Sequence, residues 1–186
     1  MEKYIPVSDR MRLYSGIEID VFNFKESDID IKDIAHALSL MCRFAGHTKS
    51  FYSVAQHCIW IANNLKDEHK LEGLLHDASE AYLVDIPTPV KMHLESYSGV
   101  ETSIMEIVFK KFGLTYPLTP EVKSVDKAAL QYEWNNAVLA DLAPVMTSKE
   151  AEEKFLEMFY KLYYEKTNRI VSKSQPAKFT EAQPGA

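Results

Sequence analysis

The sequence predicts an all-α protein that forms a single compact helical domain. Only 6 glycines occur among the 186 residues, which disfavours a loop-rich all-β fold. Apolar residues recur at three- and four-residue intervals along most of the chain, as amphipathic helices require. No repeat or linker-like segment divides the chain, and its length suits one domain with a substantial core. We therefore place the domain at residues 1–171 and predict that the polar segment 172–186 is a disordered tail.

The composition narrows the range of functions. Hydrophobic residues make up 46% and charged residues 26% of the chain, as in ordinary globular proteins. The net charge of -6 argues against binding of long nucleic acid, although a bound cation and a few local bases would still permit a small phosphorylated ligand. No apolar run reaches the roughly 18 residues of a membrane span, and the N-terminal segment lacks the apolar core of a secretory signal. Cys42 and Cys58 are too few for a disulfide framework, and we expect a soluble, cytoplasmic protein.

The first helices are predicted from start signals and apolar stripes. The first 30 residues are mixed in character and predict no regular element. A helix is expected to begin within residues 28–33 and to end near residues 42–46, before a loop. Ser53 is suited to cap the second helix, expected over residues 53–65. The apolar stripe of that helix comprises Val54, Cys58, Ile61 and Leu65.

Two further helices are expected in the middle of the chain. Leucines, Ala78 and Tyr82 at helical spacing predict one continuous helix over roughly residues 70–83. It must end before Pro87, because proline lacks an amide hydrogen and restricts the residue before it. A further stripe over residues 100–112 predicts the next helix, with Gly113 placed to end it.

Two good start signals mark the last helices. Thr119, Pro120 and Glu121 combine a capping hydroxyl, a proline in the first turn and an acid near the positive end of the helix dipole. The helix that follows is apolar on two sides, so we expect most of its surface to be buried. Thr147 and Glu150 have the spacing of a capping box and predict a last, aromatic-rich helix. Its aromatic residues suit either the core or an interface between subunits.

Five histidine and carboxylate residues form a candidate metal site. Imidazole nitrogen and carboxylate oxygen both bind divalent metals of intermediate hardness. His57 lies on the flank of the apolar stripe of its helix, where a ligand at a helix–helix contact should lie. On a regular helix His76, Asp77 and Glu80 would point to roughly the same side, although a solvated polar face explains that spacing equally well. A lone helical histidine is also usually structural, whereas Asp126 in a buried helix would need a cation or hydrogen-bond donors.

A family resemblance decides between these interpretations. The segments that carry it are SVAQHC at residues 53–58, LLHDASEAYLVDIPTPVK at 74–91 and SVDKA at 124–128. Together they resemble the HD-domain phosphohydrolase superfamily, which is named for a tandem His-Asp. Residues 76–91 are similar to bacterial 5′-deoxynucleotidases, and residues 30–58 to phage and prophage members that include phage dATP triphosphohydrolases. The resemblance extends over roughly residues 13–141, most of the chain.

The resemblance implies an HD-domain helical bundle that holds one divalent metal ion. The family signature H…HD…D implies four ligands: His57, His76, Asp77 and Asp126. Four protein ligands on a six-coordinate ion leave two positions for water and a phosphate oxygen. The ligand set alone does not identify the metal, because Mn²⁺, Co²⁺, Zn²⁺, Fe²⁺ and Mg²⁺ all tolerate it.

Matching positions imply roles for five further residues. Glu80 is expected to orient or deprotonate the attacking water, and Asp85 to handle a proton of the water or of the leaving group. Arg43 and Lys91 are expected to bind phosphate, the first through its planar fork and the second as a point charge. Phe44 is a candidate for stacking on the base, with ordinary core packing as the alternative.

His47 and Lys49 precede the His57 helix and are weaker candidates for phosphate binding. The resemblance predicts an enzyme that cleaves the 5′-phosphoester of a deoxynucleotide. The favoured form is a dNTP triphosphohydrolase, acting on dATP and releasing triphosphate; the alternative is a 5′-deoxynucleotidase acting on dNMPs. A cyclic-nucleotide or alarmone hydrolase and a non-catalytic nucleotide sensor are lesser alternatives. Family members also predict a homo-oligomer, with no long nucleic acid and no membrane as partner.

Overall fold

The prediction of an all-α fold is confirmed. A computed structural model describes residues 10–138, 140 and 145–174, with the backbone alone described for residues 170–174. Within these residues the only sheet is a two-stranded antiparallel ribbon of β1 (Met11–Arg12) and β2 (Glu18–Ile19). The α-helices are α1 (Ile31–Leu40), α2 (Val54–Asn63), α3 (Lys70–Leu75), α4 (Glu80–Leu83), α5 (Thr88–Lys91), α6 (Tyr97–Lys111), α7 (Pro120–Glu133) and α8 (Ser148–Ser174). Short 3-10 helices are η1 (Val21–Asn23), η2 (Glu26–Asp28) and η3 (Arg43–Gly46), and a π-helix, η4 (Trp134–Val138), follows α7.

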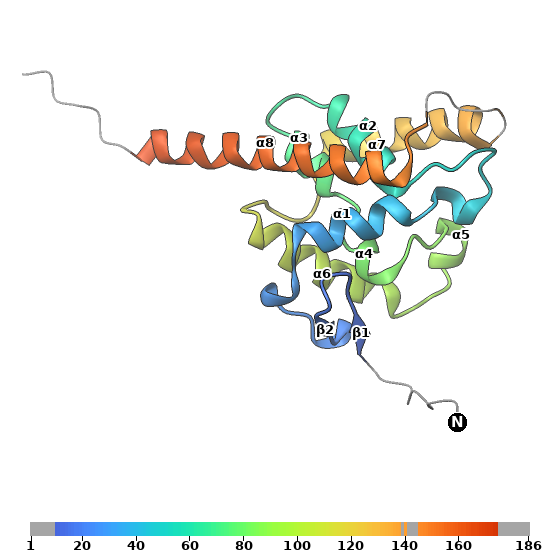
Figure 1. Ribbon diagram of the computed structural model, residues 1–186, viewed down its shortest axis with the longest axis horizontal. Helices are drawn as coiled ribbons and strands as arrows, with labels where there is room; N and C mark the ends of the chain where they lie inside the picture. Colours follow the sequence, from blue (N-terminus) through green and yellow to red (C-terminus); the bar gives the residue numbers. More distant parts are fainter. Residues whose placement is uncertain (1–9, 139, 141–144, 175–186) are drawn as a thin grey trace, which may run out of the picture.

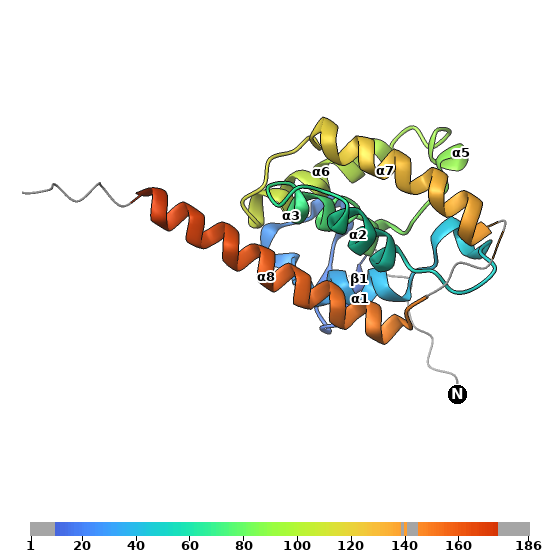
Figure 2. The same cartoon turned by 90° about the horizontal axis from the view of Figure 1, so that it is seen from above.

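Helix α2 is the centre of the molecule. It packs against α1, α3, α7 and α8, and Figure 2 shows α7 and α8 lying on its two sides. Almost every side chain of α2 is buried, His57 among them. Apolar side chains of α1, α2, α3, α6 and α8 join in one large core, which includes Phe155 and Phe159 of α8. Val122 and Ala129 of α7 instead form a smaller cluster with Ile61 and Leu65. Phe155 and Phe159 therefore face the core, whereas Tyr160 and Tyr164 of the same helix are 48% and 69% exposed.

Helix starts follow the predicted chemistry in α2 and α8. Ser53 and Gln56 form a capping box at the start of α2, and each side chain accepts a hydrogen bond from the other's backbone amide. Thr147 and Glu150 do the same before α8. At the end of α6, Gly113 adopts a φ of +66°, a conformation that suits glycine.

The predicted continuous helix over residues 70–83 is wrong. Helix α3 ends at Leu75, residues 76–79 form a turn, and α4 begins at Glu80. Within the turn the amides of Ala78 and Glu80 donate to the carbonyls three residues earlier, at 3.0 Å each. An α-helix bonds to the carbonyl four residues earlier, so the backbone in this turn is wound more tightly than an α-helix. Ser79 instead donates its amide to the sulfur of Met105 at 3.3 Å. Apolar periodicity continues through this turn and therefore does not reveal it.

Helix α7 is also less buried than its two apolar sides predict. One side packs on α2 and buries Val122 and Ala129. The other side carries Leu130 and Trp134, which are 46% and 49% exposed. These two side chains line a cavity instead of a core. Ligand cavities are also lined by apolar side chains, so an apolar stripe can indicate either a core or a cavity. The predicted capping role of Thr119 is wrong too, because its hydroxyl donates to Glu72 at 3.0 Å.

The end of the chain differs from the predicted boundary at residue 171. Helix α8 continues past Val171 to Ser174, and its last turns extend beyond the rest of the molecule (Figure 1). The remaining part of the predicted tail, residues 175–186, lies outside the described residues. No helix in the described ranges is long and apolar enough to cross a membrane.

Candidate metal centre and its cavity

Two buried histidines from neighbouring helices face each other at the centre of the site. His57 lies on α2 and His76 directly follows α3, and their Nε2 atoms are 3.2 Å apart. The Nδ1 atom of His57 is 2.6 Å from an oxygen of Glu133, and that of His76 is 2.8 Å from the carbonyl of Gly73. Both partners are acceptors, so each Nδ1 carries the hydrogen and each Nε2 presents a lone pair. Two facing lone pairs repel unless a cation or proton lies between them.

Two carboxylates complete the cluster. Oδ2 of Asp77 is 3.2 Å from Nε2 of His76 and 3.5 Å from that of His57. Oδ1 of Asp126 is 3.3 Å from Nε2 of His57 and 3.8 Å from that of His76. Ligand atoms at about 2.1 Å from one octahedral ion are about 3 Å apart in neighbouring positions and about 4.2 Å apart in opposite positions. Each carboxylate therefore lies within 3.8 Å of both Nε2 atoms, and His57, His76 and Asp126 form a group that could hold one ion.

The electrostatic field in the cluster favours positive charge. Burial alone would lower the pKa of His76, but Asp77 raises it well above its usual value. Burial alone would raise the pKa of Asp77 and of Asp126, yet the two histidines hold both carboxyl groups below their usual range. A cluster of histidines and carboxylates that is removed from water needs a cation or a proton to balance the charge of its carboxylates.

A thiol next to the cluster forms a second possible group of ligands, with His76 and Asp77. It belongs to Cys58, which is fully buried in α2. Burial raises the pKa of this thiol to about 11, so it stays protonated at neutral pH. Cys58 does not line the cavity that Asp77 and Asp126 line, so the histidine and carboxylate set is the one open to a ligand.

Glu80 and Asp85, the two predicted catalytic acids, lie beside the cluster. Both line the same cavity as Asp77 and Asp126. Glu80 is 5% exposed, and its Oε2 has no hydrogen-bond partner among the described residues. Burial and the neighbouring carboxylates raise its pKa well above the usual value. Burial likewise raises the pKa of Asp85. Both groups therefore keep a proton to higher pH than an exposed carboxyl group does, which favours a role in proton transfer.

The residue before Asp85 has an uncommon backbone conformation. Val84 has a φ of 74°, which is strained for a β-branched side chain. Its carbonyl accepts a hydrogen bond from the hydroxyl of Tyr97 at 3.0 Å. Strain of this kind persists only where the surrounding structure holds it, and it is frequent at functional sites.

The two predicted phosphate-binding residues both line the cavity, but each already contacts carboxylates. Nη2 of Arg43 donates to Glu133 at 3.1 Å, and its Nη1 is 3.8 Å from oxygens of both Asp77 and Asp85. Its Nε is buried without a partner. Nζ of Lys91 donates to Glu101 at 2.6 Å. Burial alone would lower the pKa of Arg43 and of Lys91, but their carboxylate partners raise both.

The loop after Arg43 presents an aromatic ring to the cavity. Phe44, Ala45 and Gly46 all have positive φ values, of 55°, 51° and 84°. The Phe44 ring meets the ring of Trp134 edge-on, with centroids 6.1 Å apart, and both side chains line the cavity. Phe44 lies outside the main core cluster, so core packing does not account for it. Of the weaker candidates in this loop, His47 lines the cavity, whereas Lys49 is not among its lining residues.

The cavity has a volume of about 1300 Å³. That is enough for a nucleotide, because ligand sites commonly measure about 300–1000 Å³. Its lining includes four acids, the predicted ligands Asp77 and Asp126 and the predicted catalytic residues Glu80 and Asp85. The aromatic loop, the segment Ile86–Pro89 and residues of α7 also line it.

Sequence reasoning missed Glu133, which links two of the predicted site residues. Glu133 is fully buried and accepts hydrogen bonds from His57, Arg43 and Tyr52. Its position was available in the sequence, because it follows Asp126 by seven residues, or about two helical turns. Residues at that spacing share a face of a helix. An acid on the same face as a presumed ligand was the signal to notice.

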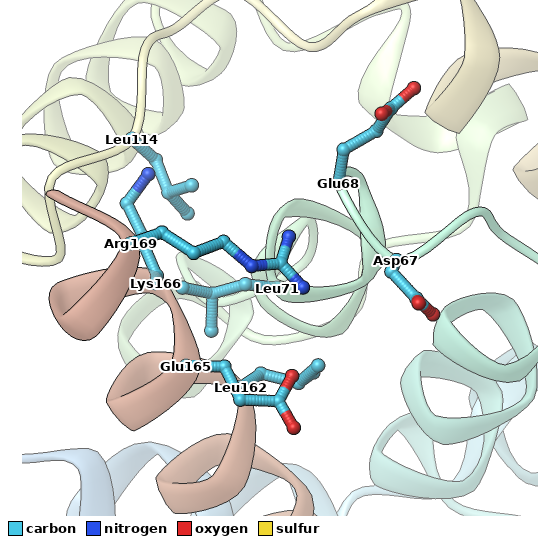
Figure 3. A pocket seen from close by; sticks show the side chains of 8 residues that line it. All are labelled: Asp67, Glu68, Leu71, Leu114, Leu162, Glu165, Lys166 and Arg169. Atoms are coloured by element: carbon cyan, nitrogen blue, oxygen red, sulfur yellow. The ribbon is translucent and has the colours of Figure 1, made fainter. Parts of the chain in front are cut away.

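A second cavity provides a contrast (Figure 3). It measures about 220 Å³ and lies where the end of α8 meets the segment before α3. Its charged lining residues are Asp67, Glu68, Glu165, Lys166 and Arg169. The side chains of Asp67 and Glu68 are 72% and 70% exposed. No histidine lines this cavity, and its charges do not converge on one buried point.

The protein is thus an all-α domain with a candidate metal centre, which histidine and carboxylate side chains form. No family model matches the chain. The chain is 38% identical over 147 residues to the uncharacterized protein YfdR of Escherichia coli K12. The matched region covers 78% of this chain and 83% of YfdR. It therefore belongs to the same family as YfdR. An uncharacterized protein of Rhodobacter capsulatus is 35% identical over 128 residues, or 63% of this chain and 65% of that protein.

Proposed function

We propose that this protein is an HD-type, divalent-metal-dependent phosphohydrolase that cleaves the 5′-phosphoester of deoxynucleotides and releases the deoxynucleoside. The observation that carries the proposal is the convergence of the Nε2 atoms of His57 and His76 with the carboxylates of Asp77 and Asp126. This convergence occurs beside a cavity of nucleotide size. The sequence resemblance to HD-domain phosphohydrolases supports the same conclusion.

The residues present fit a divalent metal. Two neutral imidazoles and two carboxylates would balance the charge of a divalent ion, so that an anionic phosphate can approach without strong repulsion. When bound, such an ion supplies polarisation of a phosphate oxygen and lowers the pKa of water. The ligand types suit Mn²⁺, Co²⁺, Fe²⁺, Zn²⁺ or Mg²⁺.

Proton transfer is assigned to the two acids of the cavity. Hydrolysis forms a bond between a water oxygen and the 5′-phosphorus and breaks the bond from that phosphorus to O5′. Glu80, whose Oε2 has no hydrogen-bond partner among the described residues, is placed to orient the attacking water and, in its ionised form, to accept the proton of that water. Asp85, whose pKa is raised by burial, is placed to give a proton to the departing O5′. The products are the deoxynucleoside and the phosphate or polyphosphate.

Binding of the nucleotide is assigned to other residues that line the cavity. Arg43 lies next to Asp77 and Asp85, and its planar guanidinium can bind phosphate oxygens. Lys91 adds a second positive charge at the cavity. Phe44 and Trp134 offer aromatic faces to the base.

The favoured substrate is a dNTP, with dATP first, because the sequence around Arg43 resembles phage dATP triphosphohydrolases. One observation favours the alternative, a 5′-deoxynucleotidase. The charged side chains that line the cavity are three cations, Arg43, Lys91 and Lys127, and four acids, Asp77, Glu80, Asp85 and Asp126. The first two cations are already paired with carboxylates, which suits a monophosphate better than a highly charged triphosphate.

A substrate screen separates these proposals. The purified protein would be depleted of metal, supplied with Mn²⁺ or Co²⁺, and incubated with dNMPs, dNDPs and dNTPs. Release of triphosphate from dATP supports the triphosphohydrolase, and orthophosphate from monophosphates alone supports the nucleotidase. Asp77→Ala should abolish both metal binding and turnover, since it removes a ligand. Undiminished hydrolysis by Asp77→Ala, or no hydrolysis of any deoxynucleotide by the metal-loaded wild type, contradicts the proposed function.

A further inference from the structure

Glu133 joins three side chains from separate parts of the chain. It is the last residue of α7 and is fully buried. Its Oε1 accepts hydrogen bonds from Nδ1 of His57 at 2.6 Å and from the hydroxyl of Tyr52 at 3.0 Å. Its Oε2 accepts a hydrogen bond from Nη2 of Arg43 at 3.1 Å. One carboxylate thus contacts both a presumed metal ligand and a presumed phosphate-binding residue.

We propose that Glu133 is a positioning residue that prepares the metal centre and the phosphate-binding arginine together. This inference rests on the proposed function, because it takes His57 as a metal ligand and Arg43 as a phosphate ligand. Glu133 itself lines no part of the large cavity. It acts through its two neighbours rather than on a nucleotide.

The contact with His57 fixes which nitrogen of the ring can bind a metal. A carboxylate acceptor at Nδ1 holds the hydrogen on that nitrogen and leaves the lone pair on Nε2. The Nε2 atom then points at His76, 3.2 Å away, and at Asp126, 3.3 Å away. The same contact fixes the rotation of the imidazole ring. Metal-binding histidines commonly have such a partner, and loss of the partner weakens metal binding about 10- to 100-fold.

The contact with Arg43 holds a guanidinium that would otherwise be buried without a close partner. The other carboxylates near it, on Asp77 and Asp85, are 3.8 Å from Nη1, beyond good hydrogen-bond distance. Binding at Nη2 leaves Nη1, whose carboxylate neighbours Asp77 and Asp85 are 3.8 Å away, for a phosphate. A glutamine at this position would keep one acceptor but lose the charge, and would present an amide donor to either Arg43 or His57. A carboxylate is therefore required to serve both neighbours.

The position of Glu133 on α7 couples it to a ligand of the same helix. Asp126 and Glu133 are seven residues apart and lie on one face of α7, the face toward α2. Figure 2 shows α7 running alongside α2, which carries His57. A single helix thus supplies one ligand directly and orients another from two turns away.

The test compares three variants of the full chain in binding experiments that do not depend on turnover. Glu133→Gln removes the charge at the proposed positioning residue. Tyr52→Phe removes only the hydroxyl that donates a hydrogen bond to Glu133. Glu72→Gln is the matched control, because Glu72 is also a buried helical glutamate, 6% exposed, and accepts hydrogen bonds from the amide and hydroxyl of Thr119 without contacting a predicted ligand. The measurements are calorimetric titration with Mn²⁺ or Co²⁺ alone, titration with inorganic phosphate, and ¹⁵N–¹H spectra of the histidine rings in the metal-free protein.

Glu133→Gln should weaken binding of the metal about 10- to 100-fold, and it should weaken binding of phosphate to the metal-loaded protein as well. The ring signals of His57 should show loss of the Nδ1–H form. Tyr52→Phe should change metal affinity less than about threefold, because it leaves Glu133 and its contacts with His57 and Arg43 in place. Glu72→Gln should lower the melting temperature but leave metal affinity and the His57 signals unchanged.

Unchanged metal affinity and unchanged His57 signals in a folded Glu133→Gln protein would overturn the proposal. So would an equal loss of metal affinity in Glu72→Gln, because the effect would then follow from general destabilisation. A wild-type protein that binds metal and shows the expected loss in Glu133→Gln, yet hydrolyses no deoxynucleotide, contradicts the proposed function and supports the role of Glu133. A wild-type protein that binds no metal overturns both.

Discussion

The two cavities described above are lined by similar kinds of charged residues, but these residues are more buried in one cavity than in the other. In the large cavity most of the charges are buried: the side chains of Arg43, Asp85 and Asp77 are 11%, 13% and 19% exposed, and that of Asp126 is 43% exposed. In the small cavity the side chains of Asp67 and Glu68 are 72% and 70% exposed (Figure 3). The large cavity also has polar atoms that lack protein partners, Nε of Arg43 and Oε2 of Glu80. Burial, convergence and unmet hydrogen bonds distinguish a candidate site, whereas the presence of charge alone does not.

The largest expected difference between the cavities is in metal binding. Asp126→Asn removes a charged ligand whose oxygen lies 3.3 Å from Nε2 of His57, and it should weaken binding of Mn²⁺ by about 100-fold or more. Asp67→Asn is the matched change in the small cavity and should leave Mn²⁺ affinity unchanged. Equilibrium dialysis with metal analysis measures both. Equal losses in the two variants would remove the distinction between the cavities.

A smaller effect is expected on the pH dependence of stability. The pKa of Glu80 is raised above its usual 4.5 by burial and by Asp77 and Asp85. A raised carboxyl pKa means that the folded metal-free protein favours protonated Glu80. The stability contributed by this preference is fully present below about pH 4.5 and is lost as the pH rises through the folded-state pKa.

Glu80→Gln cannot ionise and should therefore avoid this loss. At neutral pH the metal-free variant should be more stable than wild type by about 1–2 kcal/mol, with a gap that shrinks toward pH 4.5. Denaturant unfolding at several pH values measures the gap. The same substitution should abolish hydrolysis, since it removes the proposed proton acceptor. Parallel stability curves for variant and wild type would show that Glu80 ionises normally.

The smallest effect is expected in the small cavity. Glu165→Gln changes a half-buried charge at the end of α8 and should alter the free energy of unfolding by no more than about 0.5 kcal/mol. Metal affinity and any hydrolysis should not change. Thermal melting and a Mn²⁺ titration are sufficient to check this. A change in metal affinity would indicate that the two cavities are coupled through α3 and α8.

Much of the fold follows from local sequence patterns. The capping boxes before α2 and α8 involve residues three positions apart, so a short stretch of sequence contains all the atoms that matter. Apolar stripes failed where the same pattern has two structural explanations. The second stripe of α7, with Leu130 and Trp134, lines a cavity instead of a core. The turn at residues 76–79 changes the backbone hydrogen bonds without interrupting the apolar spacing.

The candidate site was predictable only in part. The four presumed ligands came from the ordered family pattern, since helical spacing alone did not exclude a solvated face. Glu133 escaped notice because its partners are distant in sequence: His57 is 76 residues away, Tyr52 81 and Arg43 90. No local pattern contains such contacts, and they appear only when the helices are packed together.

The arrangement of α7 has a consequence for how this fold can diversify. The helix bears Asp126 and Glu133, and it also lines the cavity with Asp126 and Leu130, so shifting the helix to reshape the cavity would displace both acids. Two other lining segments, the loop with Phe44, Ala45 and His47 and the segment Ile86–Pro89, carry none of the four predicted ligands. Relatives in which natural selection has favoured other ligands should therefore differ in length and composition in these two loops, while α7 keeps its place.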